Sequence, residues 1–308
     1  MTHAVVIPLF NKAPYIVRTL ESLMLQTKMP DELIIVDDQS TDGSLAIAKD
    51  FLAEQSISFK NCRIEIISLQ RNEGPGHARN TGFLKTNSEL ISFLDADDLY
   101  HPELLEVASE AFEKENLEFM VLNIMFLPGG EIYPDLKALK KYLQPLSENL
   151  YEVINPLKAV TSPHFIMGVG SNVITKRRWL TSTQYRTDAY LNEGIDFWYR
   201  VLKQILYRTA IGKIALLSGN YLHVTEVKGS LSRKTYAHFK EIDFPPVLSR
   251  YQNSKDLHDR LLMGMVGKRW YTYAIKSLKS PKQKILFIGH YSYLLPKYVG
   301  YKIRRLLS

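Results

Sequence analysis

The chain has 308 residues, 45% of them hydrophobic, which is enough to fill the core of one large domain or of one domain with an appendage. This composition excludes a disordered chain, and the single cysteine, Cys62, excludes an internal disulfide bond. The net charge of +7 comes from the C-terminal segment 260–308, which has 11 of the 39 Lys and Arg residues and no Asp or Glu. The rest of the chain has 28 basic and 32 acidic residues, so it is slightly acidic.

The N-terminal sequence and the lone cysteine predict a cytoplasmic protein. A single cysteine is typical of a reducing compartment. The run "MTHAVVIPLF" has no basic leader and no small-residue cleavage pattern, and no window of about 18 uninterrupted apolar residues occurs. We therefore expect neither a signal peptide nor a spanning helix.

The first 125 residues alternate between two periodicities. Short runs rich in β-branched residues predict buried strands at 4–8, 32–37, 63–69, 89–95 and 118–126. Apolar residues three or four apart predict helices between them, at about 16–24, 45–52, 78–84 and 104–112. Repeated strand and helix units predict an α/β fold with a mostly parallel sheet and helices on both faces, in which ligands lie beyond the carboxyl ends of the strands.

The rest of the chain has weaker signals. We expect a short strand at 170–176, a helix at 192–207 with an apolar stripe, and strands at 213–218 and 220–226. After residue 235 the pattern predicts helices, with breaks at "DFPP" and "SPKQK". The expected division is one domain over 1–234, with halves 1–115 and 116–234, and a basic, aromatic helical extension over 235–308.

Three carboxylates follow the fourth predicted strand in "ISFLDADDLY". Residues two apart point to the same side of a strand, so Asp95 and Asp97 could converge on one point. Mg²⁺ and Mn²⁺ prefer one or two carboxylates together with phosphate oxygens and water. The same run could instead begin a helix, where the dipole favours acidic residues. The pattern favours a metal site for a diphosphate and leaves helix capping open.

Polar or glycine-rich segments follow the second and third predicted strands. Asp37 and Asp38 end the strand in "ELIIVDDQSTDGS", and capping the next helix needs at most one polar group of this segment. The others suit hydrogen bonds to a nucleotide. In "NEGPGHARNTGF" two glycines allow close approach of the backbone, and Arg79 supplies a planar cation for phosphate or for an ordinary surface ion pair. Neither the Walker spacing nor the dinucleotide spacing is matched.

In their order and separation, "VVIPLFNKAPYIVRTLESLMLQT", "ELIIVDDQSTDGS", "NEGPGHARNTGF" and "ISFLDADD" resemble the family 2 inverting nucleotide-sugar glycosyltransferases of the GT-A fold. The resemblance is close over about 3–115 and looser to about 226. It implies that Pro8 and Phe10 lie against the nucleotide base, that Asp38 hydrogen-bonds the base, and that Arg79 helps to hold the diphosphate. Phe10 could also be an ordinary core aromatic.

The resemblance also implies a divalent cation, Mn²⁺ or Mg²⁺. Asp95 and Asp97 would be the Asp-x-Asp pair, with Asp97 nearer to the metal. His223, on a late strand, would complete the metal shell as a histidine does in some GT-A enzymes, although a lone strand histidine is more often structural.

An inverting transfer needs a general base, and the family usually supplies it from a Glu-Asp pair that opens a helix continuing "xDxWxxR". The corresponding segment here is "NEGIDFWYR", in which Glu193 keeps the first position and Gly194 replaces the second. Glu193 and Asp196 lie on one helical face, so either could reach the substrate, and Glu193 is our first choice. Asp196 could instead pair with Arg200 four residues later.

The basic extension interleaves Lys and Arg with aromatic residues over 260–308. Such amphipathic helices suit an anionic membrane surface, where a lipid-linked acceptor would be found. Helices that pack on the catalytic domain explain the pattern almost as well. Stacking on nucleic acid explains it least, and no nucleic-acid-binding motif occurs, so we expect no nucleic-acid partner.

The resemblance therefore implies a metal-dependent enzyme that moves a sugar from a nucleoside diphosphate, with UDP favoured, to a saccharide or lipid-linked saccharide with inversion. Such an enzyme serves cell-surface polysaccharide synthesis, with possible peripheral attachment to the inner face of the membrane. One alternative is a sugar-phosphate nucleotidyltransferase, and another is a non-catalytic membrane-docked binding protein. The segment "GSLSR" (229–233) is a candidate loop for closing over the donor.

Overall fold

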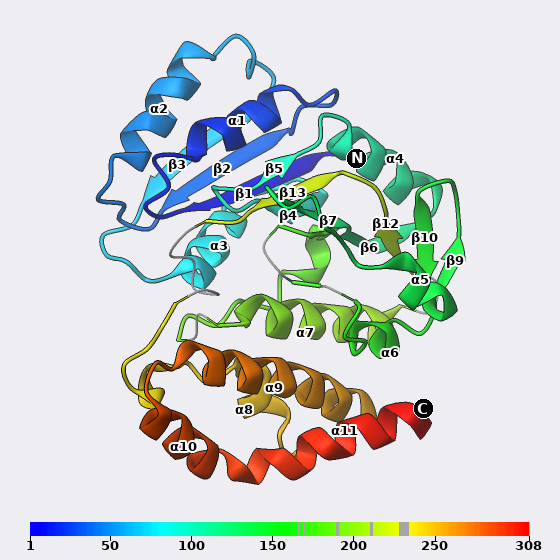
Figure 1. Cartoon of the computed structure of the whole chain (residues 1–308). Helices are drawn as coiled ribbons and strands as arrows, with labels where there is room; N and C mark the ends of the chain where they lie inside the picture. The colour runs from blue at the N-terminus through cyan, green and yellow to red at the C-terminus, as the bar shows by residue number, and fades with distance from the viewer. Residues whose placement is uncertain (166, 169–170, 189–190, 210–211, 228–233, 308) are drawn as a thin grey trace.

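Strands and helices alternate through the first half of the chain, as the sequence predicts (Figure 1). The computed structural model describes all residues except 166, 169–170, 189–190, 210–211, 228–233 and 308, and it describes side chains up to residue 301. The first elements are β1 (His3–Leu9), α1 (Ile16–Met24), β2 (Glu32–Asp37), α2 (Ser44–Glu54), β3 (Arg63–Ser68), α3 (Pro75–Phe83), β4 (Leu90–Phe93), β5 (Leu99–Tyr100), α4 (Leu104–Lys114) and β6 (Leu117–Leu122).

The second half of the chain contains shorter elements, several of which the sequence did not predict. They are β7 (Ile124–Leu127), β8 (Ile132–Tyr133), α5 (Leu136–Leu139), β9 (Leu143–Pro145), β10 (Leu150–Val153), α6 (Pro156–Val160), β11 (Val173–Lys176), α7 (Glu193–Arg208), β12 (Lys213–Leu217) and β13 (Leu222–Thr225). The helices of the C-terminal segment are α8 (Pro246–Tyr251), α9 (Leu257–Ser277), α10 (Pro281–His290) and α11 (Leu295–Leu307).

A nine-stranded sheet with the order β3-β2-β1-β4-β11-β6-β12-β10-β9 forms the centre of the molecule. β1 pairs in parallel with both β2 and β4, and β12 pairs in parallel with β6. Only β11 and β10 run against the other strands of this sheet. The expected mostly parallel sheet is confirmed, and the carboxyl ends of β1, β2 and β4 meet at one edge.

Side chains of the central strands alternate between two cores. Along β2, Leu33 and Ile35 belong to the core on one face, while Ile34 and Val36 belong to the core on the other. Helices α1, α2 and α4 cover the first face, and α3 and α7 cover the second (Figure 1). Burial on both faces explains why these strands are continuous apolar runs.

The run predicted as one strand at 118–126 is two strands in different sheets, so that prediction is wrong in its extent. β6 lies inside the central sheet, whereas β7 joins the second sheet, of order β5-β13-β7-β8. Asn123 lies between the two strands, and its N–H donates to the carbonyl of Leu217 on β12. The chain therefore leaves the central sheet at a buried polar residue.

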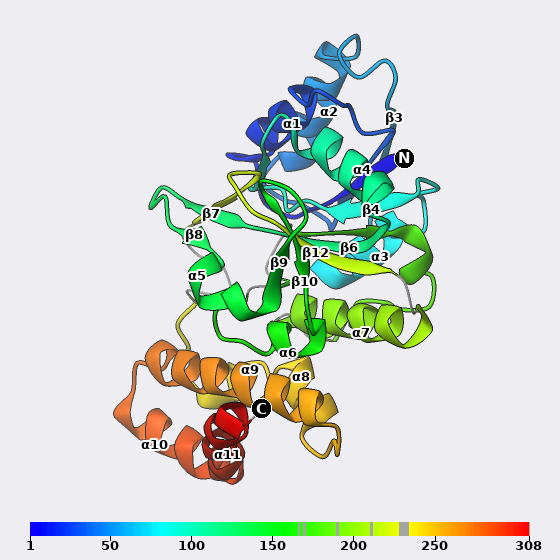
Figure 2. The same cartoon turned by 90° about the vertical axis from the view of Figure 1, so that its right-hand side faces the viewer.

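Helices α8 to α11 form a layer below α7 (Figures 1 and 2). Trp270, Tyr298 and Tyr301 are buried, in the same core as the side chains of α7. Packing, which the sequence left as an alternative to membrane contact, therefore accounts for these three aromatic residues. Among the described residues, no helix has both the length and the hydropathy that crossing a membrane requires.

Candidate active site at the strand ends

A cavity of about 620 Å³, here called the strand-end cavity, lies beyond the carboxyl ends of β1, β2 and β4. It brings together seven of the predicted site residues from five separate segments: Pro8, Phe10, Asp38, Arg79, Asp95, Asp97 and Glu193. Asp196 and His223 are not among the described residues that line it. The loop predicted at 229–233 lies outside the described residues.

Phe10 lies at the surface of the cavity and not in the core, because 43% of its side chain is exposed. It follows β1, all of whose residues except Pro8 are buried, and Pro8 lines the same cavity. An exposed ring next to a proline gives the cavity a flat apolar wall. A planar ligand could stack there.

Asp38 shapes the loop opposite this wall. Its buried carboxylate accepts hydrogen bonds from the backbone N–H groups of Glu73 (2.7 Å) and Gly74 (2.8 Å). Gly74 has φ 87°, a conformation that favours glycine, which lets both N–H groups face one carboxylate. Burial raises the pKa of Asp38, against the effect of the two N–H groups. A carboxylate has about four acceptor sites, so Asp38 keeps acceptor capacity for a ligand.

Arg79 is a buried cation that joins two carboxylates from different parts of the chain. Its Nη2 donates to Asp95 at 2.7 Å and its Nη1 donates to Glu193 at 3.2 Å. The guanidinium also lies 5.2 Å from the centre of the Tyr185 ring. Burial raises the pKa of Glu193, although the Arg79 charge opposes this shift. Glu193 is therefore a carboxylate inside the cavity with a pKa above its ordinary value.

The three aspartates after β4 have different environments. Asp97 pairs with Lys12, and burial raises its pKa against the effect of that lysine. Asp98 points into the protein, where it accepts hydrogen bonds from Ser171 Oγ (2.8 Å) and from the N–H of Thr225 (3.2 Å). Asp95 and Asp97 reach the cavity, and Asp98 holds their loop against β13.

Lys12 was not among the predicted site residues. The signal for it was its place directly after β1 in "PLFNK", the same strand-end position as the predicted residues. It lines the cavity and pairs with Asp97, so the described lining contains two cations, Lys12 and Arg79, each beside one carboxylate of the Asp-x-Asp pair.

Two carboxylates at the cavity wall fit a hard divalent cation that takes its other ligands from phosphate and water. Among the described residues no group of three or more His, Cys, Asp or Glu side chains is arranged to hold a metal ion. The structure places the predicted third ligand, His223, outside the described cavity lining, with its ring nitrogen bonded to Asn220. The residues present therefore fit a metal held by Asp95 and Asp97 without His223.

Asp196 lies apart from the cavity and joins α7 to α8. Its carboxylate, 1% exposed, accepts hydrogen bonds from Arg200 Nε and Arg250 Nε, each at 2.9 Å. The geometry therefore gives Asp196 the alternative role stated for it, as the partner of Arg200, and adds a second arginine that the sequence did not reveal.

Gly194, the departure from the Glu-Asp pair, has a steric reason. A Cβ added at this position would lie 2.4 Å from the carbonyl oxygen of Gly168. That distance is far below van der Waals contact, so the backbone of one segment would have to move. The first turn of α7 can carry the carboxylate of Glu193, but position 194 has no room for a side chain.

Comparisons with known proteins agree with this geometry. A family model described as Glycosyl transferase family 2 matches residues 4–168. The succinoglycan biosynthesis protein ExoO of Rhizobium meliloti is 29% identical over 235 residues, which cover 74% of this chain and 62% of ExoO. The chain spans less than two thirds of the length of the curated relatives it matches.

Two solved structures have a similar fold. TarS 1–349 of S. aureus in complex with UDP-GlcNAc has a TM-score of 0.62 at 17% identity, covering 99% of this chain and 90% of that one. The mannosyltransferase PcManGT of Pyrobaculum calidifontis, in complex with GDP-Man and Mn²⁺, has a TM-score of 0.54 at 16% identity, covering 98% and 83%. These likenesses confirm the expected GT-A architecture, and the family match over more than half of the chain shows that the protein belongs to glycosyltransferase family 2.

Proposed function

We propose that the protein transfers a sugar from a UDP-sugar to a saccharide or lipid-linked saccharide, with inversion at the anomeric carbon, during assembly of a surface polysaccharide. The observation that carries this proposal is the chain of charges Asp95–Arg79–Glu193 in one cavity. It puts a cation for the diphosphate beside a carboxylate that can take a proton. The UDP-GlcNAc complex of TarS and the role of ExoO in succinoglycan biosynthesis support the donor and pathway class.

In this proposal the donor spans the strand-end cavity. The base lies against Phe10 and Pro8 and bonds to Asp38, and the diphosphate lies near Arg79, which binds phosphate oxygens in its planar fork. Asp95 and Asp97 would hold Mn²⁺ or Mg²⁺, whose contribution is to neutralise charge on the diphosphate. The Mn²⁺ complex of PcManGT supports a divalent ion.

Glu193 is proposed as the general base. It would remove the proton of the acceptor hydroxyl while that oxygen attacks the anomeric carbon opposite the diphosphate. A base works best when its pKa approaches the working pH, and burial moves the pKa of Glu193 in that direction. Asp196 is not proposed for this role, because two arginines occupy its carboxylate.

The test uses two isosteric variants and two controls. Glu193→Gln should bind UDP like the wild type and lose transfer by about 10²–10⁴-fold, the usual contribution of a general base. Asp97→Asn should lose the Mn²⁺ dependence of donor hydrolysis. Asp50→Asn and Glu54→Gln, exposed changes on α2, should behave like the wild type. Normal transfer by Glu193→Gln would exclude it as the base.

We also propose that α10 and α11 contact an anionic membrane surface. Exposed apolar side chains occur on these two helices and in the turn between them, among the basic residues, namely Ile285, Leu286, Ile288, Tyr293, Leu295 and Val299. Such a surface suits insertion at the lipid interface. Co-sedimentation with vesicles containing phosphatidylglycerol should be lost in Ile285→Glu/Val299→Glu and kept in Ile57→Glu, which alters an exposed residue far from these helices in the chain.

A further inference from the structure

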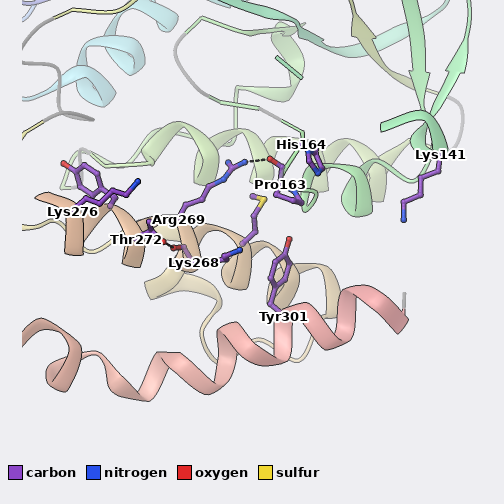
Figure 3. A pocket seen from close by; sticks show the side chains of 10 residues that line it. Lys141, Pro163, His164, Lys268, Arg269, Thr272, Lys276 and Tyr301 are labelled. Atoms are coloured by element: carbon purple, nitrogen blue, oxygen red, sulfur yellow. Dashed lines mark hydrogen bonds between the residues drawn. The ribbon is translucent and has the colours of Figure 1, made fainter. Parts of the chain in front are cut away.

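A second cavity, here called the basic cavity, has a volume of about 860 Å³ and lies between α9, α11 and the segment around Pro163 (Figure 3). None of the described residues that line it also lines the strand-end cavity. Nothing in the proposed transfer uses it.

Four cations line the basic cavity: Lys141, Lys268, Arg269 and Lys276. No acidic side chain is among its described lining residues, and the described part of the chain gives none of the four cations an ion pair. Three of the four lie on α9, within a segment that has no Asp or Glu. The excess positive charge is therefore not balanced by the cavity's own residues, and an anionic ligand would balance it.

Arg269 shows how the cavity holds its charge. Its Nη2 donates to the carbonyl oxygen of Pro163 at 2.6 Å, which fixes the guanidinium beside the cavity (Figure 3). A guanidinium has five N–H donors, so the others can donate to a ligand. Partial withdrawal from water lowers the pKa of Arg269. A phosphate oxygen is a suitable partner for a fixed guanidinium, because the two groups form paired hydrogen bonds.

The floor of the cavity is apolar. Met265 from α9 and Tyr301 from α11 line it and are buried, and the Tyr301 hydroxyl donates to the carbonyl of Thr161. A free phosphate or sugar phosphate would contact the cations but not these apolar lining residues. A ligand with an anionic head and an apolar chain would cover both.

We propose that the basic cavity binds the phosphate headgroup of an anionic phospholipid, with the first part of its acyl chains against Met265 and Tyr301. A nucleic acid fits less well, because the sequence has no nucleic-acid-binding motif. The inference rests on the proposed membrane contact of α10 and α11. It does not depend on sugar transfer.

The test is calorimetric titration with dihexanoyl phosphatidylglycerol, a lipid short enough to stay in solution. The triple variant Lys268→Gln/Arg269→Gln/Lys276→Gln removes three of the cations, and Lys49→Gln/Lys60→Gln/Lys114→Gln removes three exposed cations elsewhere. A basic residue near an anionic lipid strengthens binding roughly fivefold, so the cavity variant should bind on the order of a hundredfold more weakly. The control variant should bind like the wild type.

A second variant guards against misfolding of the first. Thr272 lines the cavity on an exposed part of α9, so Thr272→Trp should occupy part of the cavity and obstruct a ligand while all four cations remain. Loss of lipid binding in this variant would support the proposal. Unchanged binding in both cavity variants would place the lipid elsewhere and overturn it.

Three further measurements distinguish a lipid site from a soluble-phosphate site or a nucleic-acid site, and the basic cavity from the strand-end cavity. Glycerol phosphate that binds as tightly as the lipid would make this a soluble-phosphate site, and an oligonucleotide that displaces the lipid would make it a nucleic-acid site; either result overturns the proposal. UDP binding on the same samples reports the strand-end cavity. Loss of lipid binding with UDP binding intact is the expected result for the cavity variants, and a wild type that binds lipid but transfers no sugar would refute the proposed function alone.

Discussion

Replacing Asp196 with asparagine removes the charge that joins α7 to α8. The carboxylate is buried and accepts hydrogen bonds from Arg200 Nε and Arg250 Nε at 2.9 Å. Arg200 also donates to the carbonyl of Gln184 at 2.7 Å, so the same arginine ties down the segment before α7. An asparagine keeps the shape of the side chain but leaves two guanidinium groups without a counter-charge.

The expected loss of stability follows from these exposures. Removing one partner of a fully buried ion pair costs about 3–5 kcal/mol. The side chains of Arg200 and Arg250 are 22% and 39% exposed, so water recovers part of that energy. The amide oxygen can still accept one hydrogen bond. We therefore expect Asp196→Asn to lower the free energy of unfolding by about 2 kcal/mol.

Urea unfolding measures this loss, and Asp50→Asn, an exposed change on α2, is the control. A double-mutant cycle with Arg250→Gln should give a coupling energy above about 0.5 kcal/mol, because the two side chains are in contact. Folded Asp196→Asn should keep most of its transfer rate. If the variant were as stable as the wild type and lost transfer by about a hundredfold or more, Asp196 would be the base and our reasoning would be wrong.

Three further predictions concern packing and pH. Gly194→Ala should lower the free energy of unfolding by about 1–3 kcal/mol, measured by thermal melting, because its Cβ meets the Gly168 carbonyl; an unchanged melting temperature would contradict this. The raised pKa of Glu193 means that kcat/KM should be full above that pKa and fall as pH drops through it, at a higher pH than for an ordinary glutamate; a pH profile that Glu193→Gln leaves unchanged would refute the assignment. Burial lowers the pKa of His3 to about 3, so its contribution to the free energy of unfolding is present above the unfolded pKa of 6.5 and is lost between pH 6.5 and 3, about 4–5 kcal/mol in total. His3→Gln should therefore make the free energy of unfolding, measured by urea unfolding, fall less steeply over this pH range. An equally steep fall in the variant would refute this role of His3.

The sequence was sufficient for the parts of the fold that depend on local patterns. Apolar runs and helical periodicity predicted the β1-to-α4 alternation, because β1, β2 and β4 are buried on both faces. The sequence was insufficient where the pairing of strands distant in the chain decides which sheet a segment joins. The run at 118–126 is apolar throughout, and only the pairing of β7 with β13 places its second half in another sheet.

The same distinction holds within the site. Strand-end position pointed to Asp38 and Asp95, since residues after parallel strands lie at one edge of the sheet, whereas Arg79 came from the glycine-containing segment and from the family resemblance. The partners of these residues lie far away in the sequence: Lys12 meets a carboxylate 85 residues later, and Arg250 meets Asp196 across 54 residues. Local sequence patterns and residue spacing do not predict such long-range contacts.

Arg79 connects donor binding to the strength of the proposed base. In the described structure its guanidinium donates to Asp95 and Glu193, and its charge opposes the burial that raises the pKa of Glu193. A donor diphosphate bound in the strand-end cavity as proposed would compete for the same N–H groups, because phosphate oxygens accept hydrogen bonds from a guanidinium as carboxylates do. If the guanidinium turned to the phosphate, Glu193 would lose part of the interaction that stabilises its charged form, and its pKa would rise further. In the proposed reaction, donor binding would therefore strengthen Glu193 as a base at the stage when an acceptor hydroxyl needs to lose its proton.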